Sequence, residues 1–201
     1  MTVSAGVAAI KGTYDGEAAF SQENALESFV LSLSGAGGPG TVDALLAGLG
    51  GERVTCTVQG PLGAPVRATY GLLDSGRTAI IEMAAASGLT LLAPRERDPR
   101  RASTSGTGEL MRAALERGCE RLILGLGGSA TNDGGTGALT ALGFRFLDAQ
   151  GAPLPPGGAA LKRLARVETG GRHPRLAGVE LLVATDVTSP LLGPDGASYL
   201  F

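Results

Sequence analysis

The run Arg121-Leu-Ile-Leu-Gly-Leu-Gly-Gly-Ser-Ala-Thr-Asn-Asp-Gly-Gly-Thr-Gly137 decides the fold class of this 201-residue chain. Its first six residues form a short apolar segment, which predicts a strand. Two glycine clusters follow, and a helical pattern begins at the second. The run therefore predicts a strand, a glycine-rich loop and a helix in succession, a unit typical of layered α/β sheets.

The flanking segments repeat this alternation of strand and helix. A helix is predicted before the run, ending at Gly118, and further elements follow it in the order strand, helix, strand. Such an alternation favours α/β layers with parallel neighbouring strands. The predicted elements are helices over Thr107–Arg117, Gly134–Leu142 and Ala159–Val167, and strands over Phe144–Asp148 and Val179–Thr185.

Nearer the amino terminus the pattern changes to consecutive strands. Three strand-like runs are separated by a Pro-Gly-Pro segment and by Asp74-Ser75-Gly76, and these spacings suit antiparallel neighbours. Two amphipathic helices are predicted before them. The strands are predicted over Arg53–Gln59, Val66–Leu73 and Thr78–Met83, and the helices over Ser21–Leu33 and Val42–Leu49.

Composition excludes several classes of function. The formal net charge is -2, and the chain has no Trp and no aromatic residues interleaved with basic ones, so a nucleic-acid partner is not indicated. No apolar stretch approaches the roughly 20 residues that span a bilayer, which argues against a membrane role and for the cytoplasm. Cys56 and Cys119 lack metal-ligand or redox spacing and are expected to be buried or incidental thiols, and His173 is expected to be exposed.

The glycine-rich loop has the residue types of an anion site. Gly127, Gly128, Gly134 and Gly135 allow backbone N–H groups to approach a phosphate, while Ser129, Thr131 and Asn132 add short polar side chains. Asp133 is a candidate ligand for Mg²⁺. A Walker A motif is absent, and the match to a dinucleotide fingerprint is loose. By spacing alone, a tight turn that caps a helix explains the loop equally well.

Two further polar clusters remain ambiguous on their residues alone. Thr185 and Asp186 follow an apolar strand, where a metal ligand or general base would sit, although a turn before Pro190 explains them as well. Thr107 belongs to a Ser/Thr/Gly cluster that also suits a helix amino terminus. Glu82 ends an apolar run, and it is either buried near the site or turned to solvent.

In combination, these segments resemble the glycerate kinase family from about Gly40 to the end of the chain. The resemblance rests on four motifs in their family order, of which the GGSATNDGG string is the most characteristic. The motifs are IEMAAASGL at 81–89, TGEL at 107–110, GGSATNDGG at 127–135, and ATDVT with PLLGP at 184–194.

The resemblance implies an α/β protein, a layered sheet with helices that is part of a truncated two-domain architecture. Residues 1–50 would be a divergent piece of a Rossmann-like or flavodoxin-like domain, and residues 51–201 a second α/β domain. It also implies transfer of the ATP γ-phosphoryl group to D-glycerate with Mg²⁺, and a homo-oligomer is compatible with it. The loop residues and Thr107 and Thr185 would bind phosphate or substrate, with Asp133, Asp186 and Asn132 as the catalytic set and the two aspartates as metal ligands.

The chain also departs from the family pattern. The family's opening motif is not found, Ala36 and Pro39 stand where the family has acidic residues, and the sequence stops at Phe201 where the family continues. Loss of two carboxylates would weaken metal binding and positioning. The rival hypothesis is therefore an inactive fragment or paralogue that binds an anion or a partner chain, and an NAD-dependent enzyme ranks lower.

Overall fold

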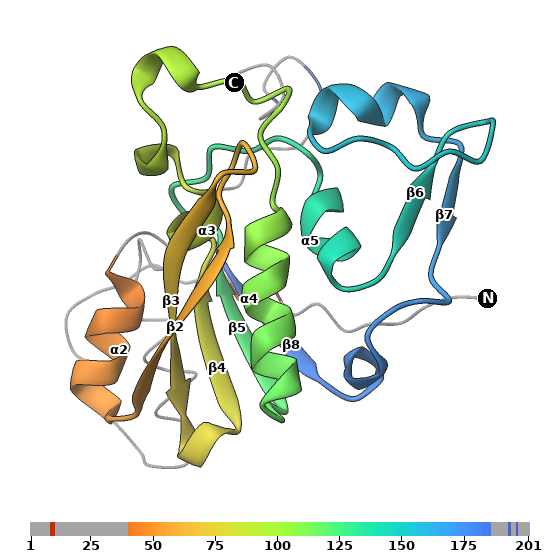
Figure 1. Cartoon of the computed structure of the whole chain (residues 1–201). Coiled ribbons are helices and arrows are strands. Elements are labelled where there is room, and N and C mark those ends of the chain that lie inside the picture. Colours follow the sequence, from red (N-terminus) through yellow and green to blue (C-terminus); the bar gives the residue numbers. More distant parts are fainter. Residues whose placement is uncertain (1–8, 11–39, 186–192, 194–195, 197–201) are drawn as a thin grey trace.

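A six-stranded mixed sheet forms the centre of the molecule (Figure 1). The computed structural model describes residues 9–10, 40–185, 193 and 196 of the chain. The strand order is β1-β8-β5-β4-β3-β2, with β4, β5, β8 and β1 parallel and β2, β3 and β4 antiparallel. The strands are β1 (Ala9–Ile10), β2 (Glu52–Gln59), β3 (Pro65–Leu73), β4 (Thr78–Glu82), β5 (Arg121–Gly125) and β8 (Glu180–Ala184).

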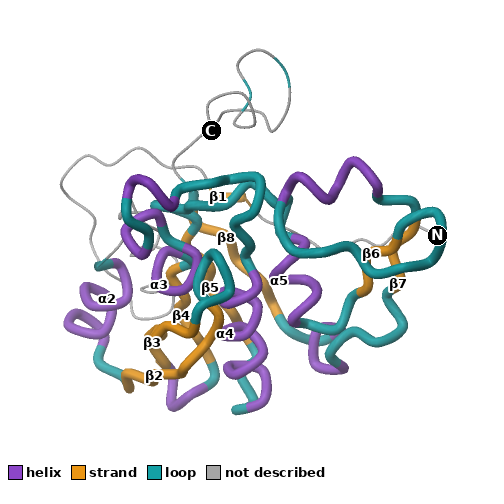
Figure 2. Tube along the Cα trace, turned by 45° about the horizontal axis from the view of Figure 1, so that its top comes forward, coloured by secondary structure: helices purple, strands orange, loops and turns teal. Residues whose placement is uncertain are grey.

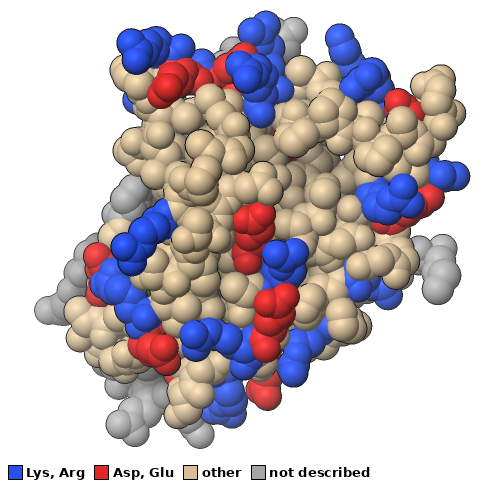
Figure 3. All heavy atoms as spheres, viewed as in Figure 1, with Lys and Arg blue, Asp and Glu red and all other residues tan. Residues whose placement is uncertain are grey.

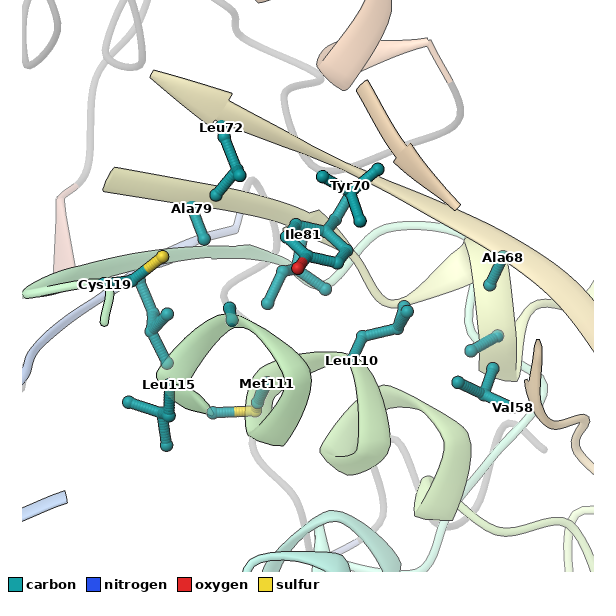
Figure 4. Packing of buried hydrophobic residues seen from close by; sticks show 14 of the residues in the cluster. Val58, Ala68, Tyr70, Leu72, Ala79, Ile81, Leu110, Met111, Leu115 and Cys119 are labelled. Carbon is teal, nitrogen blue, oxygen red and sulfur yellow. The ribbon is translucent and has the colours of Figure 1, made fainter. Parts of the chain in front are cut away.

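Helices cover both faces of this sheet. Strand β4 is buried along its whole length, and its side chains point alternately into two hydrophobic cores on opposite faces of the sheet. On one face Ile81 packs with Tyr70 of β3 and with Leu110 of helix α4 (Ser105–Glu116), as Figure 4 shows, whereas Ile80 packs with helix α2 (Thr41–Leu49) on the other. The sequence of β4 therefore reads as a continuous apolar run because neither face meets solvent.

The chain segment that connects β5 to β8 forms a smaller unit that projects from the sheet (Figure 2). Helix α5 (Thr136–Ala141) leads into β6 (Arg145–Leu147), which pairs antiparallel with β7 (Arg166–Glu168). Short helices lie in the segments that connect the larger elements. These are α3 (Ala84–Ser87) and the 3₁₀ helices η1 (Asp74–Gly76), η2 (Leu89–Leu91), η3 (Pro94–Glu96), η4 (Gly158–Arg163) and η5 (Pro174–Ala177).

The predicted helix Ala159–Val167 is wrong in its second half. The chain forms the 3₁₀ helix η4 only as far as Arg163, and Leu164 is extended. Strand β7 follows, and the Ala165 amide already donates to the Leu147 carbonyl at 2.9 Å. Pairing with β6 satisfies backbone groups that an isolated helical turn would leave to water, so the tertiary partner overrides the local pattern.

The other predicted elements within the described residues are confirmed to within about two residues, as expected for boundaries of this kind. The predicted helix Ser21–Leu33 lies outside the described residues. The division into domains at residue 50 stays a prediction; helix α2, just before it, packs on the central sheet. No helix among the described residues has the length and apolar character needed to cross a bilayer.

Candidate functional site

The carboxyl ends of β4, β5 and β8 meet at one edge of the sheet, and the candidate site lies there. The Met83 amide donates to the Gly125 carbonyl at 2.9 Å, and the Leu126 amide donates to the Ala184 carbonyl at 3.1 Å. The three segments that leave these strands therefore start side by side. This edge is where ligands gather in open α/β sheets, because loops and helix amino termini converge there.

The glycine-rich loop is held from the outside by the chain that follows α3. Gly88 and Ser129 form an antiparallel bridge, in which the Leu89 amide donates to the Gly128 carbonyl and the Ala130 amide donates to the Ser87 carbonyl, both at 2.9 Å. Gly128 has a φ of 73°, a conformation that strains any residue with a Cβ. The loop is thus fixed by backbone bonds before any ligand arrives.

Some loop amides are used internally and others are not. The amides of Ala130, Thr131, Gly135 and Gly137 all donate to protein acceptors. Within the described part of the chain, the amides of Gly127, Gly128 and Ser129 donate to no protein acceptor. Three consecutive amides at the carboxyl edge of a sheet have the donor pattern from which anion sites are built, and an anion-binding role for them stays a prediction.

The hydroxyl groups of the loop form a local pair. The Ser129 and Thr131 hydroxyls lie 2.8 Å apart, and the Thr131 amide donates to the Ser129 Oγ at 3.0 Å. Both residues are half-buried. Their mutual contact orients the Ser129 side chain beside the three amides.

Asp133 is the buried hydrogen-bond acceptor that joins two helices. Its side chain is 1% exposed, and it accepts from the Thr104 amide (2.9 Å) and hydroxyl, from the Gly135 amide (3.0 Å) and from the Gly137 amide (3.1 Å). Thr104 precedes α4 and Gly135 precedes α5, so one carboxylate closes the amino ends of both helices. A negative charge is favoured there by the amides and by the helix dipoles.

Glu82 brings a third helix to the same edge. It is 9% exposed at the end of β4, and its Oε1 accepts the Val42 amide of α2 at 2.7 Å. The amino terminus of α2 is therefore tied beside the ends of β4 and β5. The sequence left Glu82 ambiguous between a buried and a solvent-facing position, and the structure places it in the buried one.

Comparisons with known proteins show the family of the chain. The model of the glycerate kinase family matches residues 17–201. The chain belongs to the glycerate kinase family. A glycerate kinase from Bacillus subtilis (strain 168) is 53% identical over 165 residues, which cover 82% of this chain and 43% of the relative. A glycerate 2-kinase from Escherichia coli (strain K12) is 48% identical over 165 residues, 82% of this chain and 43% of the relative.

A solved structure gives the same result for the fold. The crystal structure of a glycerate kinase 2 from Salmonella typhimurium LT2 superposes with a TM-score of 0.79 and 50% identity, over 83% of this chain and 44% of that one. The predicted family and α/β class are confirmed. The chain spans less than half the length of these relatives.

The family's predicted site residues fall at one edge of the sheet where they are described. The loop contains Gly127, Gly128, Ser129, Thr131, Gly134 and Gly135. The Asn132 backbone carbonyl lies close to Gly158, at a place where a Cβ on Gly158 would meet it, and Thr185 follows β8. Thr107 is buried inside α4, with its hydroxyl 2.8 Å from the Ser87 hydroxyl. Asp186 lies outside the described residues. The individual roles of these residues stay predictions.

The described residues of this family member do not form a magnesium site around Asp133. Mg²⁺ keeps several waters and takes accessible carboxylate oxygens, whereas both Asp133 oxygens already accept protein donors and the side chain is buried. Nor do the described residues contain a group of three or more His, Cys, Asp or Glu side chains that could hold a metal ion.

Proposed function

We propose that this chain forms the glycine-loop side of a glycerate kinase site, in which ATP gives its γ-phosphoryl group to a hydroxyl of D-glycerate. The observation that carries the proposal is the set of three amides at Gly127, Gly128 and Ser129. They lie in a loop that is fixed on one side by the Gly88 bridge and on the other by Asp133. Family membership supports the same reaction.

In this reaction a hydroxyl oxygen of glycerate forms a bond to the γ-phosphorus, and the bond from that phosphorus to its bridging oxygen breaks. ADP leaves with the bond electrons, and the hydroxyl proton passes to a base. The protein's part is mainly to position the reactants and to stabilise charge on the phosphoryl oxygens. We assign that stabilisation to the three loop amides, which need no reorganisation when charge develops.

Asp133 is assigned a positioning role in this proposal. Because it accepts donors from the starts of α4 and α5, it fixes the loop at its carboxyl end. The proton acceptor remains assigned to Asp186 by resemblance alone. Mg²⁺ also remains an expectation from the resemblance, as an ion carried by the nucleotide phosphates.

The test is coupled ADP release by the purified chain with D-glycerate, ATP and magnesium chloride. We expect turnover above that of Asp186→Ala, and a kcat/KM at least tenfold lower for Gly128→Ala, because a Cβ at a φ of 73° displaces the amides. Gly151→Ala is the matched control. Gly151 has a φ of 80°, its added Cβ meets nothing within 4 Å, and it lies outside the loop, so its kcat/KM should stay within twofold.

Absence of turnover in the folded wild-type chain would defeat the kinase proposal for this chain. The alternative, a module that binds anions without catalysis, would then be supported by thermal stabilisation with ATP. Equal loss of activity in Gly128→Ala and Gly151→Ala would show that left-handed strain, and not the position of the amides, controls the rate.

A further inference from the structure

A concave surface lies beside the loop between η2 and α4. It is a hollow of about 630 Å³, and four of its lining residues are arginines within a stretch of seven. Blue side chains gather along the upper edge of the molecule in Figure 3, where this loop lies in Figure 1. The hollow is lined by Leu62, Arg95, Glu96, Arg97, Asp98, Pro99, Arg100 and Arg101.

The two acidic residues of this arginine hollow are engaged within their own loop. Glu96 Oε2 accepts the Ala93 amide at 3.0 Å, and Asp98 forms an ion pair with Arg100 at 3.1 Å. The same contact holds the pKa of Asp98 below its usual value, so the carboxylate stays ionised and paired. Arg95, Arg97 and Arg101 have no carboxylate within ion-pair distance among the described residues.

Several arginines outside the hollow are paired with carboxylates. Arg121 pairs with Glu180 at 2.6 Å, Arg117 with Glu52 at 3.8 Å, and Arg53 with Asp43. Three arginines that line one hollow without such partners concentrate positive charge there, and a multiply charged anion would neutralise it. A free fork of donors also matches phosphate oxygens in pairs.

The backbone beneath these arginines is held in place. The Arg101 and Ala102 amides donate to the Asp98 carbonyl, the Ser103 amide donates to the Pro61 carbonyl at 2.8 Å, and the Arg100 carbonyl accepts the Ala159 amide at 3.0 Å. Binding an anion therefore orders only side chains and not the loop. The volume is in the range of small-ligand sites.

We propose that the arginine hollow binds a polyphosphate chain through Arg95, Arg97 and Arg101. A single phosphate engages one or two guanidinium groups, whereas a triphosphate spans three, which selects the longer anion. The chain could belong to a nucleotide or to free inorganic polyphosphate, and both share this chemistry. In the nucleotide case the inference rests on the proposed kinase function; in the other it stands apart from it.

The test is calorimetric titration of the wild-type chain with inorganic tripolyphosphate at low salt. The double variant Arg95→Gln/Arg97→Gln should bind at least tenfold more weakly. The matched control Arg172→Gln/Arg175→Gln removes the same charge from exposed arginines before and within η5, and should bind within twofold of wild type. No binding by wild type, an unchanged Arg95/Arg97 variant, or equal losses in both variants would each overturn the proposal.

Two further arms separate the sources and the two proposals. If ATP loses affinity tenfold in the Arg95/Arg97 variant while AMP does not, the polyphosphate is that of the nucleotide. If tripolyphosphate alone loses affinity, the hollow binds free polyphosphate and the nucleotide binds elsewhere. ADP release from D-glycerate and ATP is measured separately, so a chain without turnover that still shows the tripolyphosphate loss refutes the kinase and supports the hollow.

Discussion

Asp133 and Tyr70 are both buried polar side chains, and their surroundings are opposite. Asp133 lies where α4 and α5 begin and accepts from three backbone amides and the Thr104 hydroxyl. Tyr70 lies in the core between β3 and α4, is 0% exposed, and its hydroxyl finds no partner among the described residues (Figure 4). The Asp133 carboxylate beside the candidate site has hydrogen-bond partners, whereas the Tyr70 hydroxyl in the apolar core has none among the described residues.

The difference shows which polar groups specify structure. A buried carboxylate with all its hydrogen bonds made fixes the positions of two helices relative to each other, because moving either helix would break a hydrogen bond to it. An unpaired phenol contributes through its ring, which packs with Ile81 and Leu110, while its hydroxyl costs free energy. The following predictions test that contrast, beginning with the largest effect.

Replacing Asp133 with Asn should lower the free energy of unfolding by about 3 kcal/mol, measured by urea denaturation. Both carboxylate oxygens accept amides, so the new NH₂ group must face an N–H donor at one of them. Loss of this contact should also loosen the glycine-rich loop.

Asp148→Asn is the matched control. Asp148 Oδ1 accepts both the Gln150 amide (3.0 Å) and the Ala152 amide (2.9 Å), so the amide oxygen of Asn can take over both bonds. The expected loss is below about 0.5 kcal/mol. Equal losses in the two variants would show that Asp133 has no special structural role.

Alkaline pH should destabilise the protein through Tyr70. Burial raises the pKa of Tyr70 from 10.0 to about 12, so the unfolded chain releases this proton first. Stability is unaffected by this group below pH 10 and then falls by about 1.4 kcal/mol per pH unit between the two values. Denaturation of wild type and Tyr70→Phe across this range should show the extra slope only in wild type; parallel curves would contradict the assignment.

At neutral pH, Tyr70→Phe should raise the free energy of unfolding by about 1 kcal/mol. The ring and its packing remain, while a buried hydroxyl without a partner is removed. Thermal denaturation at pH 7 measures the gain. A loss of stability instead would mean that the hydroxyl has a partner, and Tyr70 would then resemble Asp133.

Much of the fold followed from local pattern. The apolar runs of β4 and β5 marked their strands because both faces of the sheet are covered there, and the glycine after α4 marked the end of that helix because the turn needs left-handed backbone. The end of η4 could not be predicted from the local sequence, because the chain there pairs as strand β7 with β6, about 20 residues away. Pattern within a window cannot report such a partner.

The candidate site, too, could be predicted only in part from the sequence. Its place at the carboxyl edge followed from the order of strand, loop and helix around Gly127. The role of Asp133 did not, because a carboxylate after a glycine-rich loop suits a metal ligand and a helix cap equally, and only its contacts with Thr104 and Gly137 distinguish them. Glu82 was equally undecided until its bond to the Val42 amide was seen.

Strand β8 lies inside the sheet, between β5 and the edge strand β1, although it is the last strand described. A ribosome that makes this chain from its amino terminus therefore exposes β1 and β5 long before the strand that separates them exists. Until residue 184 has left the exit tunnel, both strands present open edges, which are sites of mispairing. The order of synthesis thus leaves the position between β1 and β5 open until β8 has been made.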